Sequence, residues 1–397
     1  MKKVIVAIAL FIAVSITAEA SQQTMLYDQV WKLINAKYVD PSNNHQNWYK
    51  WRKRYDSQIK TDEDAYIAID TMLASLNDPY TKFLDPKEFK EETSSIKGSL
   101  KGIGVQIGVK DGKLLIIAPM EDTPGEKAGL KAEDEILEIN GQSTKGMTVD
   151  KAAELIRGEE GTIVKLLIKR KNEENKVYSV PRAKIEIKAV STKLPFENIK
   201  LDPRVGYIRL SSFISQNAIE EFKNAMTGYG NKKGYIIDLR SNPGGLLTNA
   251  LLLSELFLTK GSVIVSTVDR ENYKDTARVQ KQYLCDKPIV ILINGGSASA
   301  SEIFSGAMKD NNRALIVGEK SFGKGLVQEI NKLPGGSGCN ITIQKYLTPS
   351  GTDIHKKGIK PDVTVTFSED DIKSKRDVQL IKANELLVRM ISYQPKS

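Results

Sequence analysis

Four short apolar runs alternate with helical segments in the second half of the 397-residue chain, and this alternation constrains the fold more than any other feature. The runs are Val205–Leu210, Tyr235–Leu239, Pro288–Ile293 and Ala314–Val317, and the intervening helical patterns include Ala218–Met226 and Leu246–Leu256. Uninterrupted apolar runs of this length are typical of strands that are buried on both faces. Strands separated by helices favour a parallel sheet. The sequence therefore predicts an α/β core.

The chain is long enough for more than one domain, because single cores stop growing at roughly 250–300 residues. Its patterns divide it into a leader (1–20), a helical region (21–97), a strand-rich segment with one helix (98–182), the α/β core (183–367) and a C-terminal helical segment (368–397). Apolar residues at three-and-four spacing predict helices at Met25–Ile34, Tyr66–Leu73 and Asp377–Ile391. Thr148 is a candidate N-cap for a helix in the strand-rich segment.

The first twenty residues have the pattern of a secretory signal. Lys2 and Lys3 precede an apolar or small run from Val4 to Thr17, and Ala18–Ala20 fits the small-x-small cleavage rule. The run is shorter than the roughly 20 residues that span a bilayer. We therefore expect cleavage after Ala20 and an exported protein, periplasmic or extracellular. Retention of the segment as a membrane anchor is the alternative.

The composition argues against a nucleic-acid-binding protein and against a disulfide-rich one. The formal net charge is only +9, and basic residues are interleaved with acidic ones. The densest basic cluster, Lys50–Arg54, lies beside Trp48 and Trp51, and a solvated, partly amphipathic helix face explains this better than nucleic-acid binding. Cys285 and Cys339 are the only cysteines, so a bond between them in an oxidising compartment stays open.

Three loops rich in glycine and small polar residues directly follow apolar strands. They are Ser241–Gly245, Gly295–Ser301 and Ser321–Gly325. Binding sites in open α/β sheets gather at the ends of strands, so we expect the chemistry at these loops.

The second of these loops contains three serines, Ser297, Ser299 and Ser301, at a strand-to-helix turn. A helix N-terminus stabilises negative charge, which suits a nucleophile and the oxyanion that its attack creates. The alternative is that the serines cap the helix, which fits Ser301 best. The pattern alone does not choose among the three.

A nucleophilic serine needs a base, and the usual partner is histidine. The chain has only His45, in the helical region and expected to be exposed, and His355, in a polar turn. Lys324 is the better candidate, because Gly323 and Gly325 flank it and burial can leave a lysine uncharged.

Gln328 follows Lys324 by four residues in the strand-like segment Leu326–Ile330, and even spacing places both side chains on one face of a strand. Its amide can then orient the lysine.

Two other motifs overlap the segment that contains Lys324. Gly318–Lys324 has the form of a P-loop, but Gly325 replaces the Mg²⁺-binding hydroxyl residue and a strand follows. The Ser-x-x-Lys form of penicillin-binding proteins also occurs, but the glycines disfavour the helix that it needs.

With these motifs in order, the chain resembles the carboxyl-terminal processing peptidases, or tail-specific proteases, which are serine endopeptidases with an inserted PDZ domain. The resemblance runs from Ser21 to Phe367 and is carried by Asn77–Thr81, Asp238–Gly245, Ser297–Glu302, Gly323–Gln328, Thr348–Gly351 and Gly358–Val363. It implies an α/β (α+β multi-domain) fold with a crotonase-like peptidase core. The strand-rich segment 98–182 resembles the PDZ domain over its whole length.

The resemblance assigns roles to the residues of the core loops. The family nucleophile matches Ser299, its base matches Lys324, and its orienting residue matches Gln328. The oxyanion hole matches the backbone N–H groups of Ala300 and of Gly245, with Gly244 less certain than Gly245.

The resemblance also implies how a substrate is recognised. In PDZ domains a glycine-containing loop binds the terminal carboxylate of a peptide, which here corresponds to Ile103, Gly104 and Val105. Arg157, after the PDZ helix, either complements the helix dipole or relays peptide occupancy to the core. The expected partners are proteins or peptides with free C-termini, cleaved through an acyl-enzyme without cofactor, metal or nucleic acid. An adaptor protein and a homo-oligomer stay open.

Two other functions fit parts of the sequence. A PDZ scaffold on an inactive core would bind tails without cleaving them, but Ser299, Lys324 and Gln328 are all present. An acyltransferase or lipase would use the same serine, but the chain has no Gly-x-Ser-x-Gly elbow.

Overall fold

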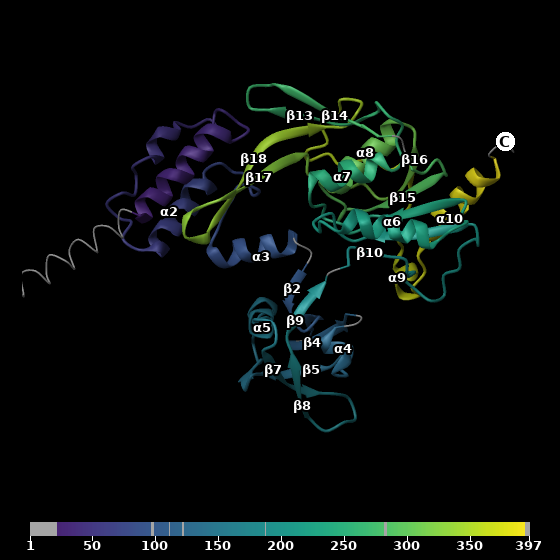
Figure 1. The fold of residues 1–397 in the computed structure, drawn as a ribbon, viewed down its shortest axis with the longest axis horizontal. Coiled ribbons are helices and arrows are strands. Elements are labelled where there is room, and N and C mark those ends of the chain that lie inside the picture. The colour runs from purple at the N-terminus through teal and green to yellow at the C-terminus, as the bar shows by residue number, and fades with distance from the viewer. Residues whose placement is uncertain are drawn as a thin grey trace, which may run out of the picture. The chain divides into compact units, whose positions relative to one another are not determined.

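The computed structural model describes residues 22–96, 99–110, 112–120, 123–186, 188–281 and 284–393. The expected leader, 1–20, and its cleavage site lie outside the described residues. Within the described ranges, no helix is both long and apolar enough to cross a membrane. The chain forms two compact units, one of Met1–Thr93 with Ala189–Ser397 and one of Ser94–Lys188 (Figure 1).

The larger unit contains the predicted α/β core. Its sheet has the order β10-β11-β12-β15-β16-β19, in which only β10 is antiparallel to its neighbour. The strands are β10 (Val190–Ser191), β11 (Val205–Leu210), β12 (Gly234–Asp238), β15 (Ile289–Ile293), β16 (Ala314–Gly318) and β19 (Val363–Thr364). The four predicted apolar runs are therefore adjacent parallel strands, and the mixed α/β fold is confirmed.

Helices cover both faces of this sheet (Figure 1). They are α6 (Ala218–Gly228), α7 (Leu247–Glu255), α8 (Ala300–Asp310) and α10 (Val378–Ser392), and the short helix α9 (Glu369–Lys373), which has no buried residue, precedes α10. Alternate strand residues face opposite sides. Ile291 packs in the cluster that contains α7 and α8, and Leu292 packs in the cluster that contains Leu387 of α10. The C-terminal helix is thus part of the core, which explains why β15 is apolar at every position.

A second sheet joins the N-terminal helical region to the core, and the apolar runs did not predict it. Its order is β1-β18-β13-β14, with β17 also paired to β18. The strands are β1 (Lys82–Leu84), β13 (Val263–Asp269), β14 (Lys274–Arg278), β17 (Leu326–Lys332) and β18 (Gly338–Leu347), and a short 3-10 helix, η2 (Pro334–Gly336), connects β17 to β18. Because β1 pairs with β18, residues more than 250 positions apart become neighbours in one sheet.

The N-terminal helical region packs around Ile341 of β18 and three tryptophans. Residues 22–37 are helical, and they are followed by η1 (Trp48–Trp51), α2 (Asp62–Ala74) and α3 (Pro86–Ile96). The amphipathic face expected over Lys50–Arg54 is present, with Trp48 and Trp51 buried and the basic side chains exposed, but it lies on a 3-10 helix that ends at Trp51 and the turns that follow it. Arg54 covers the Trp51 ring, 5.1 Å from its centroid, so its cation shields the apolar ring.

The smaller unit is a strand-rich domain with one longer helix. Its sheet has the order β3-β4-β5-β7-β8 with β6 paired to β5, and β2 pairs separately with β9. The elements are β2 (Ser99–Gly102), β3 (Val105–Lys110), β4 (Lys113–Pro119), α4 (Pro124–Lys127), β5 (Glu135–Ile139), β6 (Gln142–Ser143), α5 (Val149–Ile156), β7 (Ile163–Lys169), β8 (Lys176–Pro181) and β9 (Ala183–Glu186). The Thr148 hydroxyl accepts a hydrogen bond from the Lys151 amide, which confirms the predicted N-cap.

The two cysteines are free thiols, and both are buried. Cys285 belongs to the cluster on the α7 and α8 side of the parallel sheet, whereas Cys339 belongs to the N-terminal cluster. The disulfide that the sequence left open is absent, since the two thiols lie in different clusters.

Candidate active site

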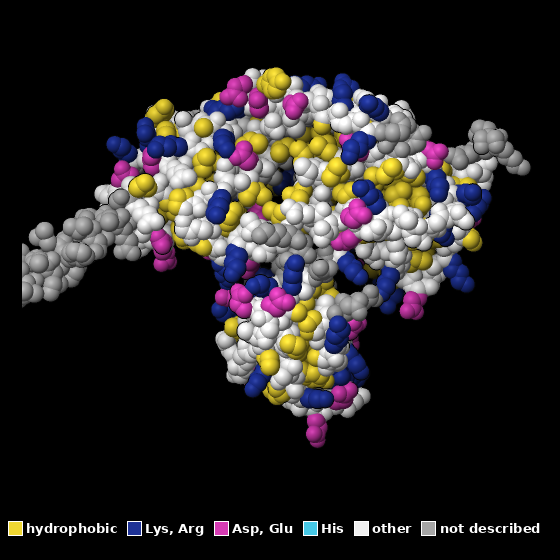
Figure 2. Space-filling view, in the orientation of Figure 1, with side chains coloured by type: hydrophobic (Ala, Val, Ile, Leu, Met, Phe, Trp, Pro, Cys, Tyr) yellow, Lys and Arg dark blue, Asp and Glu magenta, His cyan; other side chains and the backbone are white. Residues whose placement is uncertain are grey.

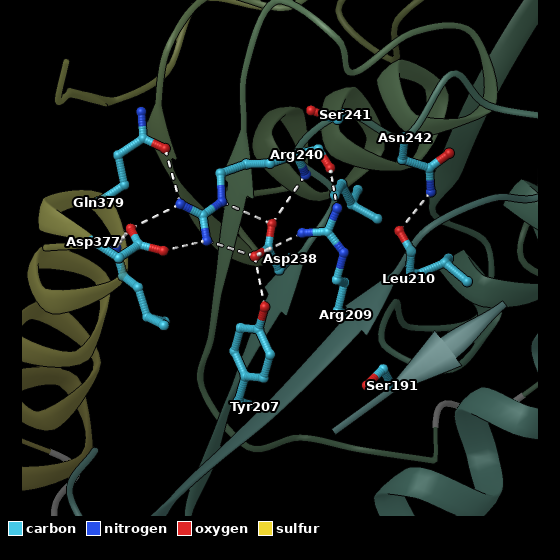
Figure 3. A network of polar contacts seen from close by, with 12 residues as sticks. Ser191, Tyr207, Arg209, Leu210, Asp238, Arg240, Ser241, Asn242, Asp377 and Gln379 are labelled. Atoms are coloured by element: carbon cyan, nitrogen blue, oxygen red, sulfur yellow. Dashed lines mark hydrogen bonds and ion pairs between the residues drawn. The ribbon is translucent and has the colours of Figure 1, made fainter. Parts of the chain in front are cut away.

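The first loop, Ser241–Gly245, begins beside a buried network of charges (Figure 3). Asp238 ends β12, is fully buried, and accepts hydrogen bonds from the Tyr207 hydroxyl at 2.8 Å and from Arg240 at 2.7 and 3.0 Å. Burial alone would raise the pKa of Asp238, but the hydrogen bonds and the charge of Arg240 lower it below its ordinary value.

Arg240 links this strand end to the C-terminal helix. Its remaining N–H groups donate to both oxygens of Asp377, each at 2.8 Å, and to Gln379 at 3.2 Å, so all five N–H groups of the guanidinium are used. Asp377 is itself the N-cap of α10 and accepts from the Leu380 amide. The start of the first loop is therefore tied to a helix that lies more than 130 residues later.

Two glycines of this loop take conformations that a side chain would block. A Cβ on Gly244, at φ 97°, would lie 2.6 Å from the Ala298 carbonyl oxygen and 2.9 Å from the Ala300 nitrogen. A Cβ on Gly245, at φ 147°, would lie 2.2 Å from the nitrogen of Ile214. The Gly244 N–H donates to the Asn242 side chain at 2.9 Å. The Gly245 N–H has no hydrogen-bond partner among the described residues, so it remains available as a donor.

The structure separates the three serines by what their hydroxyl groups bind. The Ser297 hydroxyl donates to the Leu239 carbonyl at 2.8 Å, and the Ser301 hydroxyl donates to the Asn242 carbonyl at 3.0 Å. Both side chains are fully buried. Ser299 is partly exposed, and within the described chain its hydroxyl donates no hydrogen bond, although it is placed to accept one from the Glu302 amide in the capping box of α8. Only Ser299 therefore presents a hydroxyl group that is free to react.

Ser299 also has a strained backbone, with φ 53° and ψ −115°. Such a conformation costs on the order of 1–3 kcal/mol for a residue other than glycine, so surrounding contacts must hold it. The Tyr346 hydroxyl donates to the Ser299 carbonyl at 3.2 Å. Ala300 begins α8, and its N–H has no partner among the described residues, so a second free donor lies next to Ser299.

The buried carboxylate of Glu302 joins the second loop to the third. Its Oε2 accepts from the amides of Ser299 at 2.9 Å and Lys324 at 2.8 Å. Its Oε1 accepts from the Gly323 amide at 2.7 Å and the Ser321 hydroxyl at 2.5 Å. The sequence reasoning gave Glu302 no role. The sequence does contain an indication of this role, because Ser299 and Glu302 have the spacing of a capping box.

Lys324 projects from the third loop into a largely buried environment. Burial lowers its pKa below the ordinary value, with the charge of Asp78 acting in the opposite direction. The Nζ lies 4.5 Å from the centroid of the Tyr80 ring. It makes no hydrogen bond to Ser299 or to any other described residue.

The prediction that Lys324 and Gln328 share one face of a strand is wrong. Lys324 precedes β17, and a register shift occurs between Val327 and Gln328. Gly325 packs closely against the turn that carries His355, because a Cβ there would lie 2.8 Å from the backbone nitrogen of His355. Gln328 instead donates a long hydrogen bond of 3.4 Å to the Thr342 hydroxyl.

Neither histidine contacts Ser299. His45 is exposed, as expected, but lies in a turn with φ 55° rather than in a helix. His355 is partly buried, and burial together with the charge of Lys356 lowers its pKa. Among the described residues, no group of three or more histidine, cysteine or acidic side chains is placed to hold a metal ion.

Comparison with known proteins assigns the chain to a family. The chain is 39% identical over 386 residues to a carboxyl-terminal-processing protease of Synechocystis, which covers 95% of this chain and 90% of that protein. The chain belongs to peptidase family S41. The family model for S41 matches residues 204–365, and a PDZ-domain model matches residues 115–170. The chain is thus a serine-type, carboxyl-terminal processing peptidase with a PDZ domain.

Further relatives agree with this S41 assignment. The carboxy-terminal processing protease CtpA of Bacillus subtilis is 38% identical and covers 89% of this chain and 76% of its own. The solved structure of the photosystem II D1 C-terminal processing protease has a TM-score of 0.58 and 31% identity, covering 86% of this chain and 93% of its own.

In the PDZ domain of this S41 peptidase, Ile103, Gly104 and Val105 form the entry to β3. The carbonyls of Ile103 and Gly104 accept from the Gly125 and Met120 amides, whereas their own N–H groups have no partner among the described residues. Gly104 has φ 71°, and a Cβ there would lie 2.3 Å from Thr123. Arg157 is the C-cap residue of α5.

Proposed function

We propose that Ser299 is the nucleophile and Lys324 the general base of a Ser-Lys dyad that cleaves peptide bonds through an acyl-enzyme. The observation that supports this best is the free hydroxyl of Ser299 in a site where Ser297 and Ser301 are both engaged. Glu302 holds the backbones of Ser299 and Lys324 at one carboxylate oxygen, so the two loops form a single site.

In the proposed reaction the neutral amine of Lys324 takes the proton of the Ser299 hydroxyl as the oxygen attacks the scissile carbonyl. The free N–H groups of Gly245 and Ala300 would stabilise the oxyanion. When the C–N bond breaks, the Lys324 ammonium returns the proton to the leaving amine. Water then attacks the ester, with Lys324 again acting as base, and Ser299 recovers its proton.

For this reaction the Lys324 side chain must leave the Tyr80 ring and reach the Ser299 hydroxyl. Gln328 is proposed to orient the lysine in that position. Its only side-chain hydrogen bond in the described structure is the long one to Thr342, so exchanging it costs little.

Substrate recognition is proposed to begin at the PDZ domain, where the free N–H groups of Ile103 and Gly104 bind the terminal carboxylate of a protein tail and the tail adds beside β3. Arg157 is proposed to relay to the peptidase core whether a tail occupies this groove.

The leader pattern supports export, to the periplasm or the cell exterior, as the setting of the reaction. We also propose that the parallel sheet and its helices have a crotonase-like fold, which the four parallel strand pairings support.

Active-site labelling tests the nucleophile directly. A fluorophosphonate should modify the wild-type protein once, and the mass increase should lie on the peptide that contains Ser299. Lys324→Met should slow the labelling strongly, whereas Lys320→Met, at an exposed position of the same segment, should not. Labelling of Ser297 or Ser301, or unchanged labelling of the Lys324→Met variant, would contradict the proposal.

A further inference from the structure

Tyr80 reaches the site from the N-terminal helical region, outside the residues that the S41 family model matches. The turn that carries it is fixed by Asp78, whose carboxylate accepts from the Tyr80 amide at 3.0 Å and the Thr81 hydroxyl at 2.8 Å. Thr81 in turn accepts from the Thr342 amide of β18 at 3.0 Å. Because β17 pairs with β18 and begins two residues after Lys324, one sheet fixes both the tyrosine and the lysine.

The contact between Tyr80 and Lys324 depends on charge. The face of an aromatic ring carries a negative quadrupole, which attracts an ammonium group and gives a neutral amine no comparable stabilisation. The Lys324 Nζ lies over the Tyr80 ring at 4.5 Å, and no described residue offers it a hydrogen bond that would compete. This geometry therefore favours the protonated form of the lysine.

The other charged groups around Lys324 act in both directions. Burial is the largest influence and lowers its pKa, the charges of Asp78 and Glu92 raise it, and that of Lys82 lowers it. Glu302 contacts the backbone of this loop and not the amine, and the nearby His355 has a lowered pKa of its own. Among the described residues, the Tyr80 ring is the one group that makes a direct polar or cation–π contact with the Nζ.

We propose that Tyr80 is a positioning residue that holds the protonated side chain of Lys324 and so sets how much of the lysine is available as a base. The inference rests on the proposed function, in which Lys324 must be neutral to accept the Ser299 proton. At neutral pH the ring reduces the neutral fraction.

The test compares two substitutions of Tyr80. Tyr80→Phe keeps the ring, and its hydroxyl makes no hydrogen bond in the described structure. Tyr80→Leu removes the ring but keeps apolar bulk. Tyr273→Leu is the control, because Tyr273 is 69% exposed and lies in the β13–β14 hairpin.

Two measurements are made on each variant. The first is an NMR titration of ¹³Cε-labelled lysine in a Ser299→Ala background, which reports the protonation of Lys324 without catalysis. The Lys324 signal is assigned as the one that is lost in Lys324→Met. The pH profile of kcat/KM for a tailed substrate reports its use. Tyr80→Leu should lower the titration midpoint, and kcat/KM at pH 7 relative to its alkaline plateau should rise by roughly twofold to thirtyfold. Tyr80→Phe and Tyr273→Leu should match the wild type.

An unchanged or raised midpoint in Tyr80→Leu would overturn the inference, since the ring would then act only by excluding water or not at all. A shift in Tyr80→Phe equal to that in Tyr80→Leu would also overturn it, because the hydroxyl and not the ring would be responsible. If the NMR midpoint falls while the kinetic profile stays fixed, Tyr80 holds Lys324 as inferred, but Lys324 is not the base and the proposed function fails.

Discussion

The backbone amides of Ser299 and Lys324 donate hydrogen bonds to the same carboxylate oxygen of Glu302, at 2.9 and 2.8 Å. A charged acceptor that is fully buried holds its donors strongly, because leaving either side unpaired there is costly. The position of the candidate nucleophile relative to the candidate base is thereby fixed through their backbones, while their side chains stay free to move.

Glu302→Gln should disrupt this link. An amide nitrogen would face N–H donors where a carboxylate oxygen accepted them, and each donor left unpaired costs about 1–3 kcal/mol. We expect the free energy of unfolding to fall by about 2–4 kcal/mol, and fluorophosphonate labelling of the folded fraction to slow at least tenfold. Urea denaturation and labelling kinetics measure these effects. Glu271→Gln, at a 68% exposed side chain, is the control, and equal behaviour of the two variants would remove the role of Glu302.

The lowered pKa of Lys324 predicts a pH-dependent cost to stability. Between the folded pKa and the higher unfolded one, the unfolded chain binds more protons at this residue, so stability rises with pH through that window. Lys324→Met removes the titration. The variant should therefore have a higher Tm than the wild type at pH 7, and the difference should shrink as the pH approaches the ordinary pKa of lysine. A pH-independent difference, or the same trend in Lys320→Met, would contradict the burial of an uncharged lysine.

Asp377 should matter to stability although it lies beyond the matched S41 residues. Asp377→Ala leaves the buried Arg240 with unpaired N–H groups, and breaking such a pair costs about 3–5 kcal/mol. Glu385→Ala, which breaks an exposed pair with Arg389 on the same helix, should cost less than about 1 kcal/mol. Chemical denaturation of both variants tests the difference. A small cost for Asp377→Ala would show that apolar packing alone docks α10.

Gly104→Ala should impair the binding of protein tails. The added methyl would overlap Thr123 and move the loop whose N–H groups are proposed to bind the carboxylate. Gly112→Ala is a close control, because Gly112 has φ 72° against 71° for Gly104 but open space around its Cβ position. Fluorescence anisotropy with a peptide bearing a free C-terminus should show a Kd that is at least tenfold higher for Gly104→Ala and unchanged for Gly112→Ala. Equal affinity of the two variants would place the tail elsewhere.

Local patterns predicted the parallel core, because strands such as β15 are buried on both faces and read as unbroken apolar runs. They missed β14, where Lys274–Arg278 is polar and mostly exposed, and they missed the pairing of β1 with β18, which no local pattern records. Gln328 was placed on the face of Lys324 only by assuming a continuous strand.

The choice among the three serines shows what the structure adds. Sequence spacing does not choose the nucleophile among Ser297, Ser299 and Ser301, although a capping role fits Ser301 best, and only the family resemblance favours Ser299. The structure supplies a physical difference, because the carbonyls of Leu239 and Asn242 engage the other two hydroxyls. Leu239 directly follows β12 and Asn242 lies in the first loop, so no pattern within the serine segment could have revealed it.

Cleavage of a protein substrate with a free C-terminal tail by Ser299→Ala and Lys324→Met, compared with Lys320→Met and with the wild type, tests the Ser-Lys dyad most directly. Single-turnover rates at saturating enzyme separate chemistry from tail binding. We expect both active-site variants to bind the tail normally and to cleave at least about a thousandfold more slowly, with Lys320→Met unaffected. Cleavage by either active-site variant within about tenfold of the wild-type rate would contradict the assignment.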